Sequence, residues 1–211
     1  MARARFITLE GGERSGKTAH GRKLVDWLRA QGREAVLTRE PGGTPGAEEI
    51  RQLLVRGDAA RWDPMTEALL HFAARRDHVV KVVKPALASG AWVVSDRFVD
   101  STLAYQGYGH GLGAEAIQLL RKLVLGDFAP GLTLLFDVPV ALGLERAGKR
   151  ADADARYESM GQAFHARVRD GFLAIARAEP ERIAVIDTSK SVPEVEAAIH
   201  AALCARFAEL R

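Results

Sequence analysis

Residues 11–18 read GGERSGKT and match the phosphate-loop pattern G-x-x-x-x-G-K-[ST]. The pattern functions between a β-strand and the start of a helix, because backbone N–H groups and the helix N-terminus must together face phosphate oxygens. An apolar run, Phe6–Glu10, precedes the loop, and residues 17–31 follow it with helical spacing. The start of the chain therefore predicts a strand–loop–helix unit that binds nucleotide phosphates.

Short apolar runs continue to alternate with helical segments along the rest of the chain. We expect strands at Phe6–Glu10, Ala35–Thr38, Trp92–Ser95, Leu132–Asp137 and Ile183–Asp187. Helical patterns cover roughly residues 17–31, 46–56, 64–89, 113–126, 139–148, 157–178 and 192–208. Strands that alternate with helices form parallel βαβ units, so the sequence predicts an α/β fold with an open five-stranded parallel sheet and helices on both faces. In such sheets ligands bind beyond the carboxyl ends of the strands.

The composition indicates one domain and argues against several kinds of partner. The chain has 211 residues, of which 47% are hydrophobic, which suits a single domain over residues 1–211. Its 30 basic and 27 acidic residues are scattered, so no basic run indicates nucleic-acid binding. No apolar run approaches the roughly 20 residues that span a bilayer, and the N-terminus leaves no room for a signal peptide. The single cysteine, Cys204, excludes an internal disulfide and fits a reducing compartment. We therefore expect a cytoplasmic protein that binds neither nucleic acid nor membrane.

Two of the expected strands lead to an aspartate, the residue type with which phosphate-loop enzymes commonly hold Mg²⁺. Asp96 is followed at once by Arg97, so a metal-side acid stands beside a phosphate-side cation. Asp137 stands two residues before a proline, a sequence typical of a helix start. We therefore assign Asp96 and the Thr18 hydroxyl to a magnesium site, and Asp137 to a structural role.

A tight loop follows the second expected strand, where residues 38–44 read TREPGGT. Arg39 at its start can bind a phosphate through two parallel hydrogen bonds, or it can pair with the adjacent Glu40 at the surface. Three polar side chains after Asp96 and Arg97, at near-helical spacing, suit recognition of a base and a sugar. They are Ser101, Tyr105 and Gln106.

Taken together, these segments resemble the bacterial thymidylate kinases. The matching stretches are residues 6–13 (FITLEGGE), 38–44 (TREPGGT), 84–87 (KPAL), 95–98 (SDRF), 101–107 (STLAYQG) and 156–158 (RYE). The resemblance implies a P-loop nucleoside-monophosphate kinase fold with a short mobile lid at approximately residues 146–157. It also implies transfer of the γ-phosphoryl group of ATP to dTMP, which gives dTDP and ADP in dTTP biosynthesis. Mg²⁺ as cofactor and a homodimer are further implications.

The loop motif and the resemblance together assign roles to individual residues. The residues expected to bind ATP are Gly11, Gly12, Glu13, Arg14, Ser15, Gly16, Lys17, Thr18 and Arg146. Those expected to bind dTMP are Glu13, Arg39, Phe72, Arg75, Arg97, Ser101, Tyr105 and Gln106. The expected catalytic residues are Glu13, Arg14, Lys17, Asp96, Arg97 and Arg150. Among these, the resemblance implies that Glu13 engages the dTMP sugar, that Arg39 and Arg97 bind the acceptor phosphate, that Arg75 reads the base, and that Tyr105 disfavours a ribose 2′-hydroxyl.

One departure from the family pattern concerns the residue that stacks on thymine. The family usually has Phe four residues before the base-reading Arg. Here His71 is four residues before Arg75, whereas Phe72 is four residues before Arg76. Counting back from residues 84–87 favours Arg75, and both His71 and Phe72 stay open as the stacking residue.

A second departure concerns the catalytic cation. Arg14 lies inside the loop, where bacterial members more often have Gly, and the expected lid supplies Arg146, Lys149 and Arg150. The sequence leaves Arg14 and the lid cations as alternatives for stabilising the transferred phosphoryl group.

Two other functions compete with this interpretation. One is a related kinase that acts on dUMP, CMP or a deoxynucleoside. The other is a nucleotide-dependent switch, against which Arg39 and Arg97 argue, since a switch needs no second phosphate site.

Overall fold

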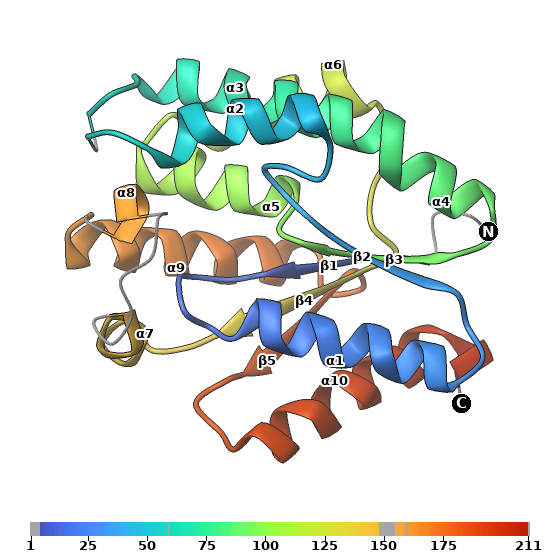
Figure 1. Cartoon of the computed structure of the whole chain (residues 1–211). Helices are drawn as coiled ribbons and strands as arrows, with labels where there is room; N and C mark the ends of the chain where they lie inside the picture. The colour runs from blue at the N-terminus through green and yellow to red at the C-terminus, as the bar shows by residue number, and fades with distance from the viewer. Residues whose placement is uncertain (1–4, 59, 148–154, 159, 211) are drawn as a thin grey trace.

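The computed structural model describes residues 5–58, 60–147, 155–158 and 160–210, and its centre is a single parallel sheet (Figure 1). The five strands lie in the order β2-β3-β1-β4-β5. They are β1 (Phe6–Glu10), β2 (Ala35–Arg39), β3 (Trp92–Asp96), β4 (Leu132–Asp137) and β5 (Ile183–Asp187). All five begin at the predicted residue, and the predicted α/β fold is confirmed.

Apart from α5, the helices follow the predicted order. They are α1 (Lys17–Ala30), α2 (Pro45–Val55), α3 (Pro64–His78), α4 (Lys84–Ala88), α5 (Val99–Thr102), α6 (Ala114–Leu125), α7 (Val140–Ala147), α8 (Ala155–Glu158), α9 (Gln162–Ala178) and α10 (Val192–Arg206). A π-helix, η2 (Val79–Val83), joins α3 to α4, so the predicted helix 64–89 is a succession of three segments. The predicted helix 157–178 is divided, because Gly161 between α8 and α9 has extended backbone angles.

The helical segment after β3 is missing from the predicted helices. It consists of α5 and the π-helix η3 (Leu103–Gly109), followed by a bend. All but one of its residues are buried, so its sequence has no apolar stripe facing a polar one, and periodicity could not reveal it.

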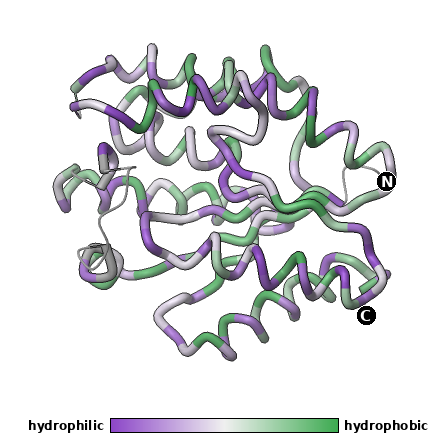
Figure 2. Tube along the Cα trace, viewed as in Figure 1, coloured by the Kyte–Doolittle hydropathy of each residue, from purple (hydrophilic) through white to green (hydrophobic). Residues whose placement is uncertain are grey.

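Strand side chains alternate between two cores, one on each face of the sheet. Phe6 and Val93 pack with residues of α3, α6 and α9. Ile7 and Val94 pack with residues of α1 and α10. Figure 1 shows α1 and α10 together on one face and α2, α3, α5 and α9 on the other, and Figure 2 shows hydrophobic residues concentrated along the central strands.

Helices α2 and α3 both begin at a capping residue followed by proline. Thr44 Oγ1 accepts a hydrogen bond from the N–H of Ala47, and Pro45 is the first residue of α2. Asp63 caps α3 in the same way, and Pro64 follows it. None of the helices within the described ranges is long and apolar enough to cross a membrane.

Candidate active site at the carboxyl edge of the sheet

The phosphate loop connects β1 to α1 at the carboxyl edge of the sheet. Gly11 has a φ of 134°, and a Cβ here would lie 2.3 Å from the carbonyl oxygen of Phe136, so this position requires glycine. Lys17 Nζ donates hydrogen bonds to the carbonyl oxygens of Gly11 (3.1 Å) and Gly12 (2.7 Å) and to Ser15 Oγ (3.1 Å). Burial, followed by the nearby charge of an arginine, lowers the pKa of Lys17 to about 8. The loop thus holds a desolvated amine whose charged form an anionic ligand would stabilise.

The two residues predicted to hold Mg²⁺ are in direct contact. Thr18 Oγ1, in the first turn of α1, donates a 2.6 Å hydrogen bond to Asp96 Oδ2 at the end of β3. The described ranges contain no group of three or more His, Cys, Asp or Glu side chains that could hold a metal. A carboxylate and a hydroxyl beside a phosphate loop fit Mg²⁺, which commonly takes one or two protein ligands and completes its shell with phosphates and water.

Asp137, at the end of β4, has structural partners. Its carboxylate accepts hydrogen bonds from Nε (2.7 Å) and Nη2 (2.9 Å) of Arg169. Its carbonyl oxygen accepts from the N–H of Thr188. These contacts agree with the structural role assigned to Asp137.

Arg97 joins the phosphate loop to the helical segment after β3. Its Nη1 donates to the carbonyl oxygen of Gly11 (3.0 Å) and to Ser101 Oγ (3.0 Å). Its Nη2 donates to Glu13 Oε1 (2.8 Å) and to the Tyr105 hydroxyl (3.2 Å), and that hydroxyl donates to Glu13 Oε1 (2.7 Å). Burial disfavours the Glu13 carboxylate, but the neighbouring cations, first among them Arg97, outweigh it and lower the pKa of Glu13 to about 2. Glu13 is therefore a carboxylate at neutral pH, held between the loop and this segment.

A buried carboxylate that sequence analysis missed ties β1 to the same segment. Glu10, the last residue of β1, has a fully buried side chain. It accepts hydrogen bonds from the N–H of Phe98 (2.8 Å) and from Ser101 Oγ (2.5 Å). Burial, followed by the charge of Asp100, raises the pKa of Glu10 to about 7. Its place at a strand end, directly before the loop, was the available signal.

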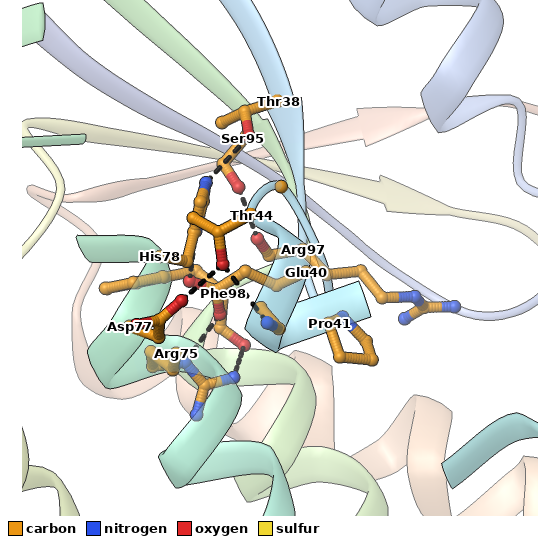
Figure 3. Close-up of polar contacts among 12 residues, drawn as sticks. Thr38, Glu40, Pro41, Thr44, Arg75, Asp77, His78, Ser95, Arg97 and Phe98 are labelled. Carbon is orange, nitrogen blue, oxygen red and sulfur yellow. Dashed lines mark hydrogen bonds and ion pairs between the residues drawn. The ribbon is translucent and has the colours of Figure 1, made fainter. Parts of the chain in front are cut away.

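Arg75 extends from α3 to the residues that follow β2 and β3 (Figure 3). Its Nε donates to Glu40 Oε2 (2.6 Å), and its Nη2 donates to Phe98 O and Thr102 Oγ1, both at 3.0 Å. His78 Nδ1 is hydrogen-bonded to the other oxygen of Glu40 (2.9 Å). The remaining nitrogen of Arg75, Nη1, is buried and has no hydrogen-bond partner among the described residues. The guanidinium is therefore fixed by three bonds and retains one donor for a further partner.

A cavity opens between these groups. Six of the eight residues predicted to bind dTMP line it: Glu13, Arg75, Arg97, Ser101, Tyr105 and Gln106. Glu13 is also part of the phosphate loop, so the loop and the cavity share a wall. Gln106 Nε2 donates to Glu67 Oε1 (2.6 Å), while Gln106 Oε1 is buried without a partner in the described part of the chain.

Arg39 lies apart from this group. Its side chain is 55% exposed, it does not line the cavity, and its Nη2 donates to both carboxylate oxygens of Glu48, at 3.0 and 3.1 Å. Pairing with Glu40, the alternative considered from the sequence, is wrong because Glu40 is buried and its carboxylate faces Arg75 and His78.

His71, and not Phe72, forms the cavity wall. His71 lines the cavity, and its Nε2 is 3.1 Å from the Tyr157 hydroxyl. Phe72 is 1% exposed, packs in the core below the cavity, and has the guanidinium of Arg75 4.9 Å from its ring centre. Arg76 points elsewhere, since its Nη1 donates to the carbonyl oxygen of Val124. On this helix, therefore, the face toward the cavity carries His71 and Arg75, whereas Phe72, one of the two candidates for stacking on thymine, lies in the core.

The candidate catalytic cations are only partly described. Arg14 has a φ of 54°, a conformation that is uncommon outside glycine and places a turn inside the loop. Helix α7 runs beside the loop, since a Cβ at Gly143 would lie 3.4 Å from the carbonyl oxygen of Glu13. Arg146 belongs to α7, but its side chain lies outside the described residues, as do Lys149 and Arg150.

A second buried carboxylate missed by sequence analysis connects the cavity to α8. Glu67 accepts hydrogen bonds from Gln106 Nε2 (2.6 Å) and the Tyr157 hydroxyl (2.9 Å), and it forms an ion pair with Arg156 Nη2 (2.5 Å). Arg156 also donates to the carbonyl oxygens of Leu54 and Asp58. An acid in the first turn of a helix is ordinarily explained by the helix dipole, so no pattern in the sequence marked Glu67.

The known proteins that are similar to this chain in sequence and in structure belong to one family. The family model of thymidylate kinase matches residues 9–199. The chain is 53% identical over 199 residues to the thymidylate kinase of Caulobacter vibrioides, covering 94% of this chain and 95% of that relative. It is 51% identical over 198 residues to the thymidylate kinase of Pseudomonas fluorescens, covering 94% of each. The crystal structure of thymidylate kinase from Ehrlichia chaffeensis is 38% identical, has a TM-score of 0.76, and covers 94% of this chain and 97% of its own.

Proposed function

This chain belongs to the thymidylate kinase family and so phosphorylates dTMP to dTDP with ATP as co-substrate, and we propose which of its residues bind each substrate and promote the transfer. The observation that carries the proposal is the ion pair of 2.8 Å between Glu13 and Arg97. It belongs at once to the phosphate loop and to the cavity beside it, as a reaction between two phosphate-bearing substrates requires.

The phosphate loop binds the donor. Backbone N–H groups of residues 11–18 and the N-terminus of α1 face the β- and γ-phosphates, and Lys17 exchanges its carbonyl partners for phosphate oxygens. The depressed pKa of Lys17, about 8, supports this role, because the nearby carboxylates do not offset the burial of the amine, and an anionic phosphate would.

The cavity binds the acceptor, dTMP. Arg75 Nη1 supplies a donor for O4 of thymine, and Gln106 Oε1 supplies an acceptor for N3–H; both atoms are buried and lack protein partners among the described residues. His71 lies against the base, and Glu13 and Tyr105 lie at the sugar. Arg97 binds the acceptor phosphate, and Arg39 at the end of β2 joins it after exchanging its pair with Glu48.

Thr18 and Asp96 are the residues that would hold Mg²⁺, which in such a site neutralises charge on the transferring phosphates. The acceptor phosphate is the nucleophile: one of its oxygens forms a bond to Pγ of ATP, while the bond from Pγ to the β–γ bridging oxygen breaks and ADP leaves with the electron pair. The protein contributes positioning and charge stabilisation, for which Arg14 or a lid cation is the candidate.

We further propose a homodimer, supported by exposed leucines on neighbouring helices. Leu119 and Leu123 of α6 are 65% and 83% exposed, and Leu69 of α3 is 49% exposed. Apolar side chains gathered on one face commonly mark an interface. A shift of Leu123→Glu from dimer to monomer in sedimentation analysis is the expected result.

We also propose a single cytoplasmic kinase domain with a lid at approximately residues 146–157, of which residues 148–154 lie outside the described ranges.

The decisive experiment is a panel of acceptors with ATP and Mg²⁺: dTMP, dUMP, dCMP, CMP and thymidine. We expect kcat/KM to be highest for dTMP. Fast turnover of another acceptor beside slow turnover of dTMP would overturn the substrate assignment, and hydrolysis of ATP unaffected by any monophosphate would favour a switch.

A further inference from the structure

Glu67 is the meeting point of three elements around the cavity. Its side chain is 1% exposed and comes from the first turn of α3. Arg156 and Tyr157 reach it from α8, and Gln106 reaches it from η3. The imidazole of His110 also lies near this carboxylate, with its Nε2 3.6 Å from Glu67 Oε1. The carboxylate itself is not among the atoms that line the cavity.

The contact with Glu67 determines which way the amide of Gln106 points. A carboxylate paired with arginine can only accept hydrogen bonds, so the group 2.6 Å away must be the NH₂ of Gln106. The amide oxygen is then turned to the other side. Gln106 lines the cavity, and its Oε1 is buried with no partner among the described residues.

Arg75 supplies the complementary atom. Its Nε and Nη2 are held by Glu40, Phe98 and Thr102, and Nη1 remains a buried donor at the cavity. Arg75 and Gln106 thus offer one unpaired donor atom and one unpaired acceptor atom among the described residues that line the cavity. A 4-oxo pyrimidine matches this pattern with its O4 acceptor and N3–H donor. A 4-amino pyrimidine reverses both positions, so cytosine would leave buried polar groups unpaired.

We infer that Glu67 is a positioning residue for base selection: by holding the amide of Gln106 in one orientation, it makes the cavity accept 4-oxo pyrimidines and reject 4-amino pyrimidines. The inference rests on the proposed binding of dTMP in this cavity. Glu67 itself does not touch the substrate. Replacing its carboxylate by an amide permits Gln106 to turn over, because an amide can donate as well as accept.

The test compares Glu67→Gln with the wild type in kcat/KM for dTMP, dUMP and dCMP. We expect the dTMP-to-dCMP ratio to contract at least about tenfold, the effect of misplacing one buried hydrogen bond. The dTMP-to-dUMP ratio should stay within about twofold, because both bases carry the same O4 and N3–H groups. A purely structural role would lower all three values together and leave both ratios unchanged, which would overturn the inference.

The matched control is Asp100→Asn, which also removes a buried carboxylate paired with an arginine. Asp100 is 6% exposed, lies 2.7 Å from Arg182, and does not line the cavity. The Asp100→Asn variant should unfold at a lower temperature, while its ratio of kcat/KM for dTMP to kcat/KM for dCMP stays unchanged. An equal contraction of this ratio in the control would also overturn the inference.

Glu67→Gln removes the carboxylate that pairs with Arg156 Nη2. A double variant, Glu67→Gln with Arg156→Gln, covers the case in which the single variant does not fold. The same contraction of the dTMP-to-dCMP ratio is expected, and an unchanged ratio counts against the inference. Absence of dTMP turnover in the wild type would instead refute the proposed function, so the two failures are distinguishable.

Discussion

Oε1 of Glu13 lies 2.8 Å from Nη2 of Arg97, and this contact connects the phosphate loop to the end of β3. Arg97 reaches it from a backbone with a φ of 70°, a conformation that few non-glycine residues adopt. Strained backbone of this kind persists where surrounding contacts hold it in place, and it clusters at active sites. The residue that binds the acceptor phosphate in our proposal is therefore fixed by the donor loop itself.

The first prediction concerns the hydrogen bonds that Arg97 donates from both Nη1 and Nη2. Arg97→Lys should lower kcat at least about 10²-fold, because one ammonium cannot reproduce hydrogen bonds that leave from two separate nitrogens. Steady-state measurement of ADP release checks it. The control is Arg182→Lys, which weakens a structural pair with Asp100 and should lower thermal stability while kcat stays within about threefold. Equal effects of the two substitutions on kcat would contradict the proposed role.

The second prediction concerns the metal. Asp96→Asn should raise the free Mg²⁺ concentration for half-maximal activity at least about tenfold, because an amide oxygen is a weaker ligand than a carboxylate. Thr18→Val should act in the same direction, and Thr18→Ser, which keeps the hydroxyl, should not. Titration of activity with Mg²⁺ at saturating ATP separates these outcomes. A wild-type Mg²⁺ dependence in Asp96→Asn would remove Asp96 from the metal site.

The third prediction decides between the loop and the lid as sources of the catalytic cation. An arginine that stabilises the transferring phosphoryl group contributes about 10³–10⁵-fold in rate. We expect Arg14→Ala to lower kcat by about this amount and Arg150→Ala to lower it less. Single-turnover phosphoryl transfer is the measurement. If the transfer rate falls strongly in Arg150→Ala and not in Arg14→Ala, then Arg14 does not stabilise the transferred phosphoryl group.

The fourth prediction separates His71 from Phe72. Burial, followed by the charges of Arg75 and Arg97, lowers the pKa of His71 to about 3, so the ring is neutral at physiological pH and presents a flat uncharged face. His71→Phe should therefore keep the KM for dTMP within about threefold, whereas His71→Glu should raise it strongly. Phe72→Ala should cost about 3 kcal/mol in free energy of unfolding through core packing and leave KM nearly unchanged. A large KM effect confined to Phe72→Ala would reverse the assignment.

The fifth prediction follows from the raised pKa of Glu10. The pKa of Glu10 is about 7 in the folded protein against an ordinary value of 4.5, so the folded protein binds the proton more tightly than the unfolded chain. The corresponding stability is fully present below about pH 4.5 and is lost as pH rises through about 7. Unfolding free energies of wild type and Glu10→Gln, measured by denaturant at several pH values, should differ by an amount that changes by up to about 3 kcal/mol over this interval. A constant difference would show that Glu10 titrates near its ordinary pKa.

Local patterns were sufficient for much of the fold. The strands at Phe6–Glu10 and Leu132–Asp137 were predicted with their observed bounds, because a continuous apolar run between turn residues is a property of neighbouring residues alone. The contact between Thr18 and Asp96 was also foreseeable, since carboxyl ends of parallel strands meet at one edge of the sheet.

The residues that line the cavity proposed to bind dTMP could not be identified from the sequence alone. Spacing could not choose between His71 and Phe72, because successive residues of a helix differ only in which face they occupy, and the packing of α3 against η3 and α9 decides that face. Arg39 and Arg75 were both expected at the substrate, yet only Arg75 lines the cavity, where Glu40 holds it.

The sequence by itself determined where the five strands begin, the phosphate loop and the residue types at the sheet edge, because these depend on short-range periodicity and motif spacing. The tertiary structure alone decided which polar atoms stay unpaired and which way they face. Glu40 and Glu67 orient Arg75 and Gln106 from 35 and 39 residues away. Such contacts form because a buried carboxylate is costly unless it accepts hydrogen bonds, and the donors can come from distant parts of the chain.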